Sequence, residues 1–133
     1  PVRDVFARHY TWHVRHRLDA SAMHEAAQSL AGTHDFKSYE TAGSARVSTV
    51  RTIHEIQVCR QVHGGSQRVV LEVEADGFLY RMVRNIVGTL VEVGRGKRPV
   101  AWPGQVLRAC DRRLAGVTAI PQGLYLVHVR FAQ

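Results

Sequence analysis

The residue with the clearest potential for chemistry is Arg84, which lies within a segment of helical periodicity. After Asp76-Gly77 the apolar residues recur at helical spacing and form one broad face: Leu79, Met82, Val83, Ile86, Val87, Leu90 and Val91. Arg84 lies on or beside that face. An unpaired charge at the edge of an apolar face is costly, so we expect a carboxylate partner for Arg84. Such an arginine would lower the pKa of the carboxylate and fix its orientation. A structural ion pair, or a side chain that extends to solvent, would also explain Arg84.

The other standard catalytic groupings do not occur in this sequence. No histidine pair or cysteine–histidine cluster has the spacing of a zinc site, so we expect no metal. The segment Gly94-Arg95-Gly96-Lys97 lacks the spacing of a phosphate-binding loop and its following Ser or Thr. None of the five aspartates is placed as an obvious nucleophile, since Asp19 suits a helix N-cap and Asp76 a turn. Cys59 and Cys110 lie far apart and are expected to be free thiols in a reducing cytosol.

The charge of the chain favours a polyanionic partner. Its 133 residues include 18 Lys and Arg against 11 Asp and Glu, giving a net charge of +7, and only Lys37 and Lys97 are lysines. Arginine suits bidentate phosphate contacts, and basic proteins gain affinity for nucleic acids by releasing counterions. The balance does not distinguish tRNA from DNA, heparin or the ribosome. No run of about 18 apolar residues occurs, so a membrane span is not expected. The length fits one domain over residues 1–133.

The elements that must position these residues can be outlined from periodicity. We expect a short strand over Tyr10–Val14, followed by a helix that Asp19 caps and Gly32 ends. Leu18, just before the cap, can serve as a hydrophobic staple. The apolar face of the helix carries Met23, Ala26, Ala27 and Leu30. Residues 33–49 lack periodicity and predict a long loop.

Two strands and their hairpin follow this loop. Thr52–Gln61 is strand-like although its apolar alternation slips after Ile53, whereas Arg68–Ala75 alternates cleanly. His63-Gly64-Gly65-Ser66 predicts the hairpin turn between them.

Two helices and a last strand complete the expected order. The helix that carries Arg84 should end at Gly94, and Gly88 inside it predicts a close packing contact. After the basic turn Arg95–Arg98, a helix should run from Trp102-Pro103 to about Cys110. A charged, solvated exit is expected at 111–113. A strand then follows in which Tyr125, Val127, Val129 and Phe131 alternate with Leu126, His128 and Arg130. The class is α+β, with a mainly antiparallel sheet backed by helices.

Several motifs of the chain resemble those of one known family. Phe78–Gly88, followed by Leu90, Glu92–Gly94 and Gly96, is similar to the signature helix of TruA-type tRNA pseudouridine synthases. The remaining motifs agree in order and spacing: Leu18-Asp19 through Leu30, Gly32–Phe36 with Ser38-Tyr39, Thr49–Ile53, and Thr118–Leu126. The resemblance covers Trp12 to Phe131, so the implied fold is the C-terminal half of the pseudouridine synthase catalytic fold.

The resemblance implies an activity and a set of site residues. Members of this family isomerise uridine to pseudouridine in the tRNA anticodon stem-loop, at tRNA positions 38–40, without a cofactor. In the family an aspartate attacks the flipped nucleoside, a tyrosine packs on the base and an arginine pairs with the aspartate; Arg84 matches that arginine. The family also implies a cytoplasmic homodimer that binds tRNA. The candidate RNA-binding residues are Arg81, Arg51, Arg46, Lys37, Arg95, Lys97 and Arg98.

The chain departs from the family in two respects. The family's aspartate belongs to an AGRTDxGV-like motif in its N-terminal half, and this sequence contains no such motif. Tyr10 lies only nine residues before Asp19, which is too near to match the family's tyrosine. We therefore expect a fragment that is inactive alone. The alternatives are a stand-alone RNA-binding module and a dimerisation domain that binds no nucleic acid.

Overall fold

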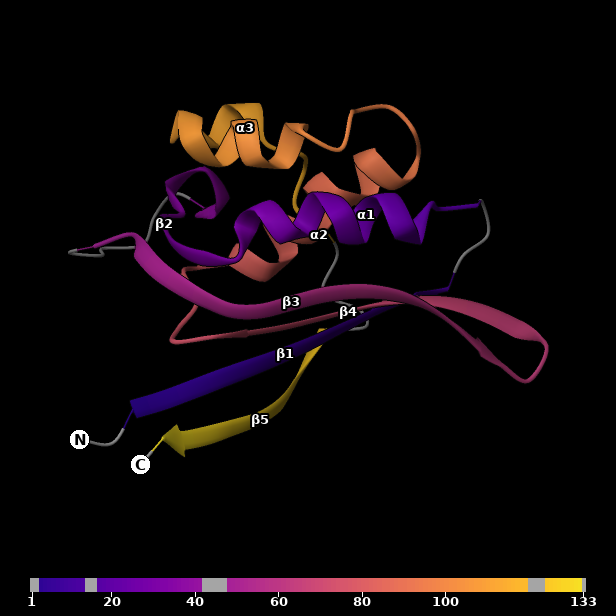
Figure 1. Ribbon diagram of the computed structural model, residues 1–133, viewed down its shortest axis with the longest axis horizontal. Helices are drawn as coiled ribbons and strands as arrows, with labels where there is room; N and C mark the ends of the chain where they lie inside the picture. The colour runs from indigo at the N-terminus through magenta and orange to yellow at the C-terminus, as the bar shows by residue number, and fades with distance from the viewer. Residues whose placement is uncertain (1–2, 14–16, 42–47, 120–123, 133) are drawn as a thin grey trace.

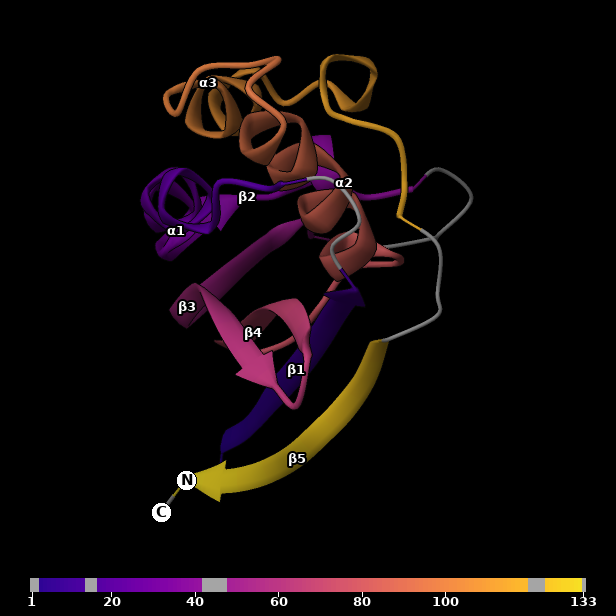
Figure 2. The ribbon, with the colours of Figure 1, turned by 90° about the vertical axis from the view of Figure 1, so that its right-hand side faces the viewer.

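The computed structural model describes residues 3–13, 17–41, 48–119 and 124–132. In these ranges five strands form one antiparallel sheet in the order β2-β3-β4-β1-β5. The strands are β1 (Arg3–His13), β2 (Gly32–Asp35), β3 (Val50–His63), β4 (Ser66–Ala75) and β5 (Leu124–Ala132). Three α-helices lie on one face of the sheet (Figures 1 and 2): α1 (Ala20–Ala27), α2 (Met82–Gly94) and α3 (Trp102–Ala109). The expected α+β class is confirmed.

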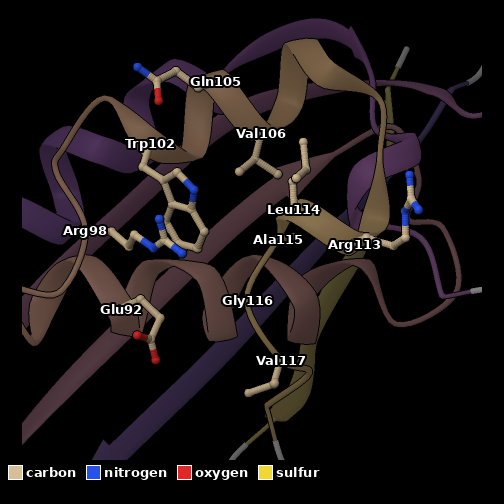
Figure 3. Close-up of a pocket in the computed structure, with 10 residues that line it drawn as sticks. All are labelled: Glu92, Arg98, Trp102, Gln105, Val106, Arg113, Leu114, Ala115, Gly116 and Val117. Carbon is tan, nitrogen blue, oxygen red and sulfur yellow. The ribbon is translucent and has the colours of Figure 1, made fainter.

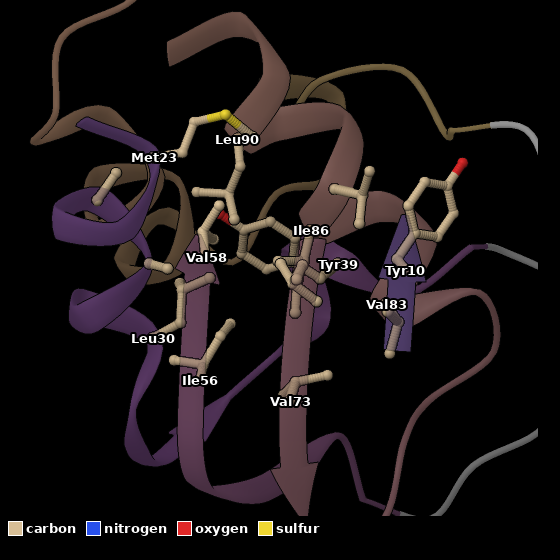
Figure 4. Close-up of a cluster of buried hydrophobic side chains, with 14 of the residues drawn as sticks. Tyr10, Met23, Leu30, Tyr39, Ile56, Val58, Val73, Val83, Ile86 and Leu90 are labelled. Atoms are coloured by element: carbon tan, nitrogen blue, oxygen red, sulfur yellow. The ribbon is translucent and has the colours of Figure 1, made fainter. Parts of the chain in front are cut away.

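The core lies between the helices and the inner face of the sheet (Figure 4). The clean alternation of β4 turns Val69, Leu71 and Val73 to this side, and all three are buried. Ile86 and Leu90 of α2 are fully buried against them. Burying one such side chain contributes about 1.5–3 kcal/mol, so this face fixes α2 on the sheet. None of the described helices has the length and apolar character needed to cross a membrane.

Helix α1 begins where its capping residue predicts. Asp19 is extended, and its Oδ1 accepts a hydrogen bond from the backbone N–H of Ala22 at 3.0 Å. Leu18 is buried in the same core cluster as Met23, which agrees with the predicted staple. The α-helix ends at Ala27, and a 3₁₀ turn over Gln28–Leu30 completes the periodic segment.

The slipped alternation of the first hairpin strand has a structural cause. The pairing of β3 with β4 shifts register between Ile53 and Glu55, as a β-bulge does. Because of this shift, Ile53 and Ile56 are both buried although their positions differ in parity. The predicted hairpin turn is present between His63 and Ser66, which pair with each other.

The long loop predicted over residues 33–49 is wrong in its first part. Residues 32–35 form β2, which pairs antiparallel with the start of β3, and Lys37–Tyr39 form a 3₁₀ turn. The strand is held by pairing with a distant segment, as in the bond between the hydroxyls of Thr33 and Thr52. Its residues show no apolar alternation from which a strand could be predicted. Residues 42–47 lie outside the described residues.

Two element boundaries also differ from the prediction. The first strand begins at Arg3 and not Tyr10, and Val14 lies outside the described residues. Helix α2 begins at Met82, because Arg81 has a left-handed backbone with φ 57° and Leu79 is buried in the turn before it. Helix α3 and the final strand lie where expected. Residues 120–123 and the side chains of β5 are not among those described.

Candidate active-site pocket at the start of helix α2

A small basic pocket lies where the chain enters α2. Its volume is about 200 Å³, and it is lined by Arg8, Phe78, Leu79, Arg81, Met82, Val83 and Arg84. Three of these residues are arginines, and none of the described lining residues is acidic. Three arginines around so small a space favour an anionic occupant. We refer to it as the arginine pocket.

The arginines reach this pocket from two elements. Strand β1 contributes Arg8, which pairs with Val73 of β4 and whose guanidinium lies 5.5 Å from the ring centroid of Phe78. Arg81 precedes α2, with its guanidinium 4.9 Å from the centroid of Tyr80. Its left-handed backbone costs about 1 kcal/mol for a residue with a Cβ. The entry to α2 is therefore shaped by a strained residue that the surrounding packing must hold.

Arg84 lies on the first turns of α2 and is half-buried. Its Nε donates to the carbonyl oxygen of Ala119 at 2.8 Å, and the Ala119 N–H donates to the Arg84 carbonyl at 3.1 Å. Within the described residues its terminal nitrogens have no hydrogen-bond partner and no carboxylate forms an ion pair with it. Within this described part of the chain, Arg84 is thus anchored at one nitrogen, and its other two could bind an anion.

Tyr10 is buried, and the charge of Arg84 influences the pKa of its hydroxyl. Burial raises the pKa of the Tyr10 hydroxyl, and the positive charge of Arg84 acts in the opposite direction. The guanidinium of Arg84 therefore acts electrostatically on a group of the core as well as on the pocket.

The segment that supplies Ala119 lies directly on α2. We call residues 112–119 the α2 strap. A Cβ built on Gly88 would lie 1.7 Å from the Val117 carbonyl oxygen, so only glycine allows the strap to approach this closely. The close contact predicted for Gly88 is confirmed.

A second group of predicted RNA-binding residues lies beyond the other end of α2. Arg95, Lys97 and Arg98 are exposed in the turn after the helix. Arg95 lies 3.9 Å from Glu92, and the guanidinium of Arg98 lies 4.8 Å from the ring centroid of Trp102. At 1.5 Å per residue, these cations are about 16 Å or more from Arg84 along the helix.

Arg98 and Trp102 line a separate groove of about 500 Å³ between α3 and the strap (Figure 3). Leu114 and Val117 also line it and are exposed.

The remaining predicted RNA-binding residues are spread over the chain. The Nη1 of Arg51 donates to the carbonyl oxygens of Ser48 and Val50, beside the loop that leads into α2. Lys37 is exposed on the 3₁₀ turn after β2. Hydrogen bonds from Arg113 lower the pKa of Asp111, and the charge of Lys37 adds a smaller effect in the same direction. Arg46 lies outside the described residues. The structure therefore brings Arg81 and Arg84 together and leaves Lys37 and Arg95–Arg98 elsewhere.

Comparison with known proteins places these motifs in a family. The family model for tRNA pseudouridine synthase matches residues 26–132. The chain belongs to the tRNA pseudouridine synthase family. It is similar to tRNA pseudouridine synthase A of Blochmanniella pennsylvanica, with 43% identity over 130 residues, which is 98% of this chain and 48% of that protein. The corresponding protein of Pseudomonas aeruginosa is 45% identical over 132 residues, 98% of this chain and 45% of that protein. The tRNA pseudouridine synthase A of Ralstonia nicotianae is 47% identical over 114 residues, which is 86% of this chain and 40% of that protein.

The family assignment confirms the resemblance read from the motifs. This chain spans about half the length of the curated relatives that it matches. Among the described residues, no group of three or more His, Cys, Asp or Glu side chains is arranged to hold a metal ion.

Two arginines of this family member were missed as candidate site residues. Arg8 enters the pocket because β1 pairs with β4, and no local pattern indicates that pairing. Arg112 was predicted to be solvated together with its neighbours, and that prediction is wrong. Its guanidinium is half-buried and donates to three oxygens of the chain, whereas Arg113 is exposed and pairs with Asp111 at 2.8 Å. Only the tertiary contacts distinguish these adjacent arginines.

Proposed function

We propose that this chain is the C-terminal part of a tRNA pseudouridine synthase that acts on uridines of the anticodon stem-loop. The isomerisation breaks the N1–C1′ bond of uridine and forms a C5–C1′ bond. The hydrogen on C5 leaves as a proton and N1 gains one, so the reaction needs no oxidant or reductant. The observation that carries this proposal is the arginine pocket, where the terminal nitrogens of Arg84 have no partner among the described residues.

Arg84 has the properties required to hold a nucleophilic aspartate. Its Nε is fixed on Ala119, so the guanidinium cannot turn freely, and its remaining nitrogens can donate two bonds to one carboxylate. The positive charges of Arg8 and Arg81 line the same pocket. Together they would lower the pKa of a carboxylate placed there and keep it ionised as a nucleophile. The aspartate itself would come from a segment upstream of this sequence.

The basic surface would bind the tRNA backbone. The net charge of +7 favours phosphate contacts, and the candidates are Arg81, Arg51, Arg46, Lys37, Arg95, Lys97 and Arg98. Arg95, Lys97 and Arg98 lie past the far end of α2 from the arginine pocket, so they would contact a part of the tRNA distant from the reacting uridine.

The test compares catalysis with binding in the complete gene product. The substrate is unmodified tRNA that carries tritium at C5 of uridine, because each isomerisation releases that label to water. We expect Arg84→Ala to lower the rate by about 100-fold or more, since it removes a bidentate charged contact worth about 3 kcal/mol. Binding of tRNA should change less than about 3-fold, because one phosphate contact at most is lost.

Arg113→Ala is the matched control, because this arginine is exposed and pairs only with Asp111 among the described residues. It should leave both rate and binding unchanged. Equal losses of rate and binding in Arg84→Ala would instead show that Arg84 is a phosphate ligand.

The second candidate is a stand-alone RNA-binding module. It would follow if the complete gene product contained no AGRTDxGV-like motif. The coding sequence of the gene separates the two: an upstream aspartate motif is required by the enzyme proposal, and a natural start near Pro1 without one contradicts it. The isolated chain should bind tRNA and release no tritium; release by the chain alone would show that the assignment of the nucleophile is wrong.

We further propose a cytoplasmic homodimer, as the family resemblance implies, and a single domain over residues 1–133. Light scattering on the complete gene product gives its mass in solution, and a monomer at the working concentration of the enzyme would contradict the homodimer.

A further inference from the structure

We propose that Arg112 is a positioning residue that holds Arg84 in its active orientation through the α2 strap. This inference rests on the proposed function, because it concerns the arginine assigned to the catalytic aspartate. The two arginines are not joined directly. They are connected through Asn85, the strap and the backbone of Ala119.

The connection begins at Asn85, the neighbour of Arg84 on α2. Its side chain is fully buried, and all of its hydrogen-bonding capacity is used. The amide nitrogen donates to the Tyr39 carbonyl at 2.8 Å and to the Thr41 hydroxyl at 3.2 Å. The amide oxygen accepts from Arg112 at 3.1 Å and from the Thr118 hydroxyl at 2.6 Å. A buried amide satisfied in this way permits one arrangement of its partners, because each lost bond would leave a buried polar atom unpaired.

Arg112 closes this network with neutral acceptors. Besides Asn85, its guanidinium donates to the Gly116 carbonyl at 2.9 Å and to the Thr118 hydroxyl at 3.1 Å. No carboxylate among the described residues pairs with it. The half-buried charge is therefore held by oxygens of the strap and of α2, and its geometry depends on the planar fork that lysine lacks. The bonds within residues 112–118 fold the strap back on itself and join it to α2.

The strap then transmits this position to Arg84. The Gly116 N–H donates to the Thr89 hydroxyl at 3.0 Å, and Thr118 is bonded to Asn85. The next residue along the chain is Ala119, whose carbonyl accepts from the Arg84 Nε. If the Arg112 bonds are lost, the 116–119 segment keeps its bonds to Thr89, Asn85 and Arg84 but is held less firmly on α2. The Ala119 carbonyl that orients the Arg84 guanidinium would then shift, although Arg84 itself is unchanged.

The experiment measures kcat and KM for tRNA in the complete gene product. Arg112→Lys keeps the charge and loses the fork, and Thr118→Val keeps the shape and loses the hydroxyl bonds. We expect each to lower kcat by about 10- to 100-fold, the range caused by displacing a catalytic group by about 1 Å. The KM should change less than about 3-fold, since no proposed tRNA contact is removed. Arg113→Lys, next to Arg112 and exposed, is the matched control and should behave as the unaltered protein.

A double variant separates positioning from a general loss of structure. If Arg112 acts through Arg84, adding Arg112→Lys to an Arg84→Lys variant should cost little further activity. A residue that only stabilises the fold would lower the active fraction by the same factor in both backgrounds, and that additive result would overturn the inference. An unchanged kcat in both Arg112→Lys and Thr118→Val, with Arg84→Ala inactive, would overturn it while leaving the proposed function intact. Full activity of Arg84→Ala would contradict the proposed role of Arg84 and, with it, the positioning role of Arg112.

Discussion

Gly88 is the point at which the α2 strap crosses its helix, and alanine at this position tests the packing that holds Arg84. In an exposed helix the change from glycine to alanine stabilises by about 1 kcal/mol. Here the new Cβ would lie 1.7 Å from the Val117 carbonyl oxygen and 2.9 Å from its carbon. The first distance is about 1.3 Å shorter than the closest approach that Cβ atoms make. The strap would therefore have to move outward.

The cost of that movement can be worked from the bonds that the strap makes near Gly88. Those that involve main-chain atoms of the strap are the bond from Gly116 N–H to Thr89 and the two bonds between Ala119 and Arg84. Each contributes about 1 kcal/mol, so losing all three costs about 3 kcal/mol. The helix propensity of alanine offsets about 1 kcal/mol of this loss. We expect Gly88→Ala to lower the free energy of unfolding by about 2 kcal/mol, against the trend for helical glycines.

Urea unfolding followed by circular dichroism measures this change as a lower midpoint at an unchanged slope. The matched control is Gly65→Ala in the hairpin turn, where an added Cβ would contact nothing within 4 Å and the midpoint should stay close to that of the unaltered chain. A Gly88→Ala variant as stable as the unaltered chain, or more stable, would refute the close packing of the strap on α2.

Three further predictions concern capping, pH and charge. Asp19→Ala should lower the free energy of unfolding by about 1 kcal/mol, since it removes the acceptor for the Ala22 N–H; an unchanged urea midpoint would contradict the cap. Burial raises the pKa of Tyr39, with a smaller opposing effect from Arg112, so the folded chain keeps this proton longer than the unfolded chain. The resulting stability is complete below the unfolded-state pKa of about 10 and falls as the pH rises above it, and Tyr39→Phe should flatten that alkaline fall in a series of urea midpoints. If Lys97 and Arg98 contact phosphates, replacing each by alanine should reduce the salt dependence of tRNA affinity by about one unit of slope, while an unchanged slope would remove that residue from the interface.

The elements that local patterns encode were predicted well, and those that depend on distant pairing were not. The Asp19 cap depends on the few residues that follow it, and the apolar residues of α1 and α2 recur every three or four positions. Short-range geometry therefore suffices to place them. Strand β2 is only four residues long, and all of them are polar or small. It forms because β3 pairs with it. The slip after Ile53 was visible in the sequence, but its cause, a register shift against β4, was not.

The sequence by itself determined the family and the residue on which the proposed chemistry rests. Motifs at consistent spacing, centred on Arg84, indicated a pseudouridine synthase, and the comparisons confirmed that assignment. Tertiary structure alone decided what surrounds Arg84: the anchoring carbonyl of Ala119 lies 35 residues further along the chain, and Arg8 comes from the opposite end. It also separated the half-buried Arg112 from the exposed Arg113. The physical reason is that periodicity reports which face a residue occupies, whereas a hydrogen bond depends on which distant segment packs against that face.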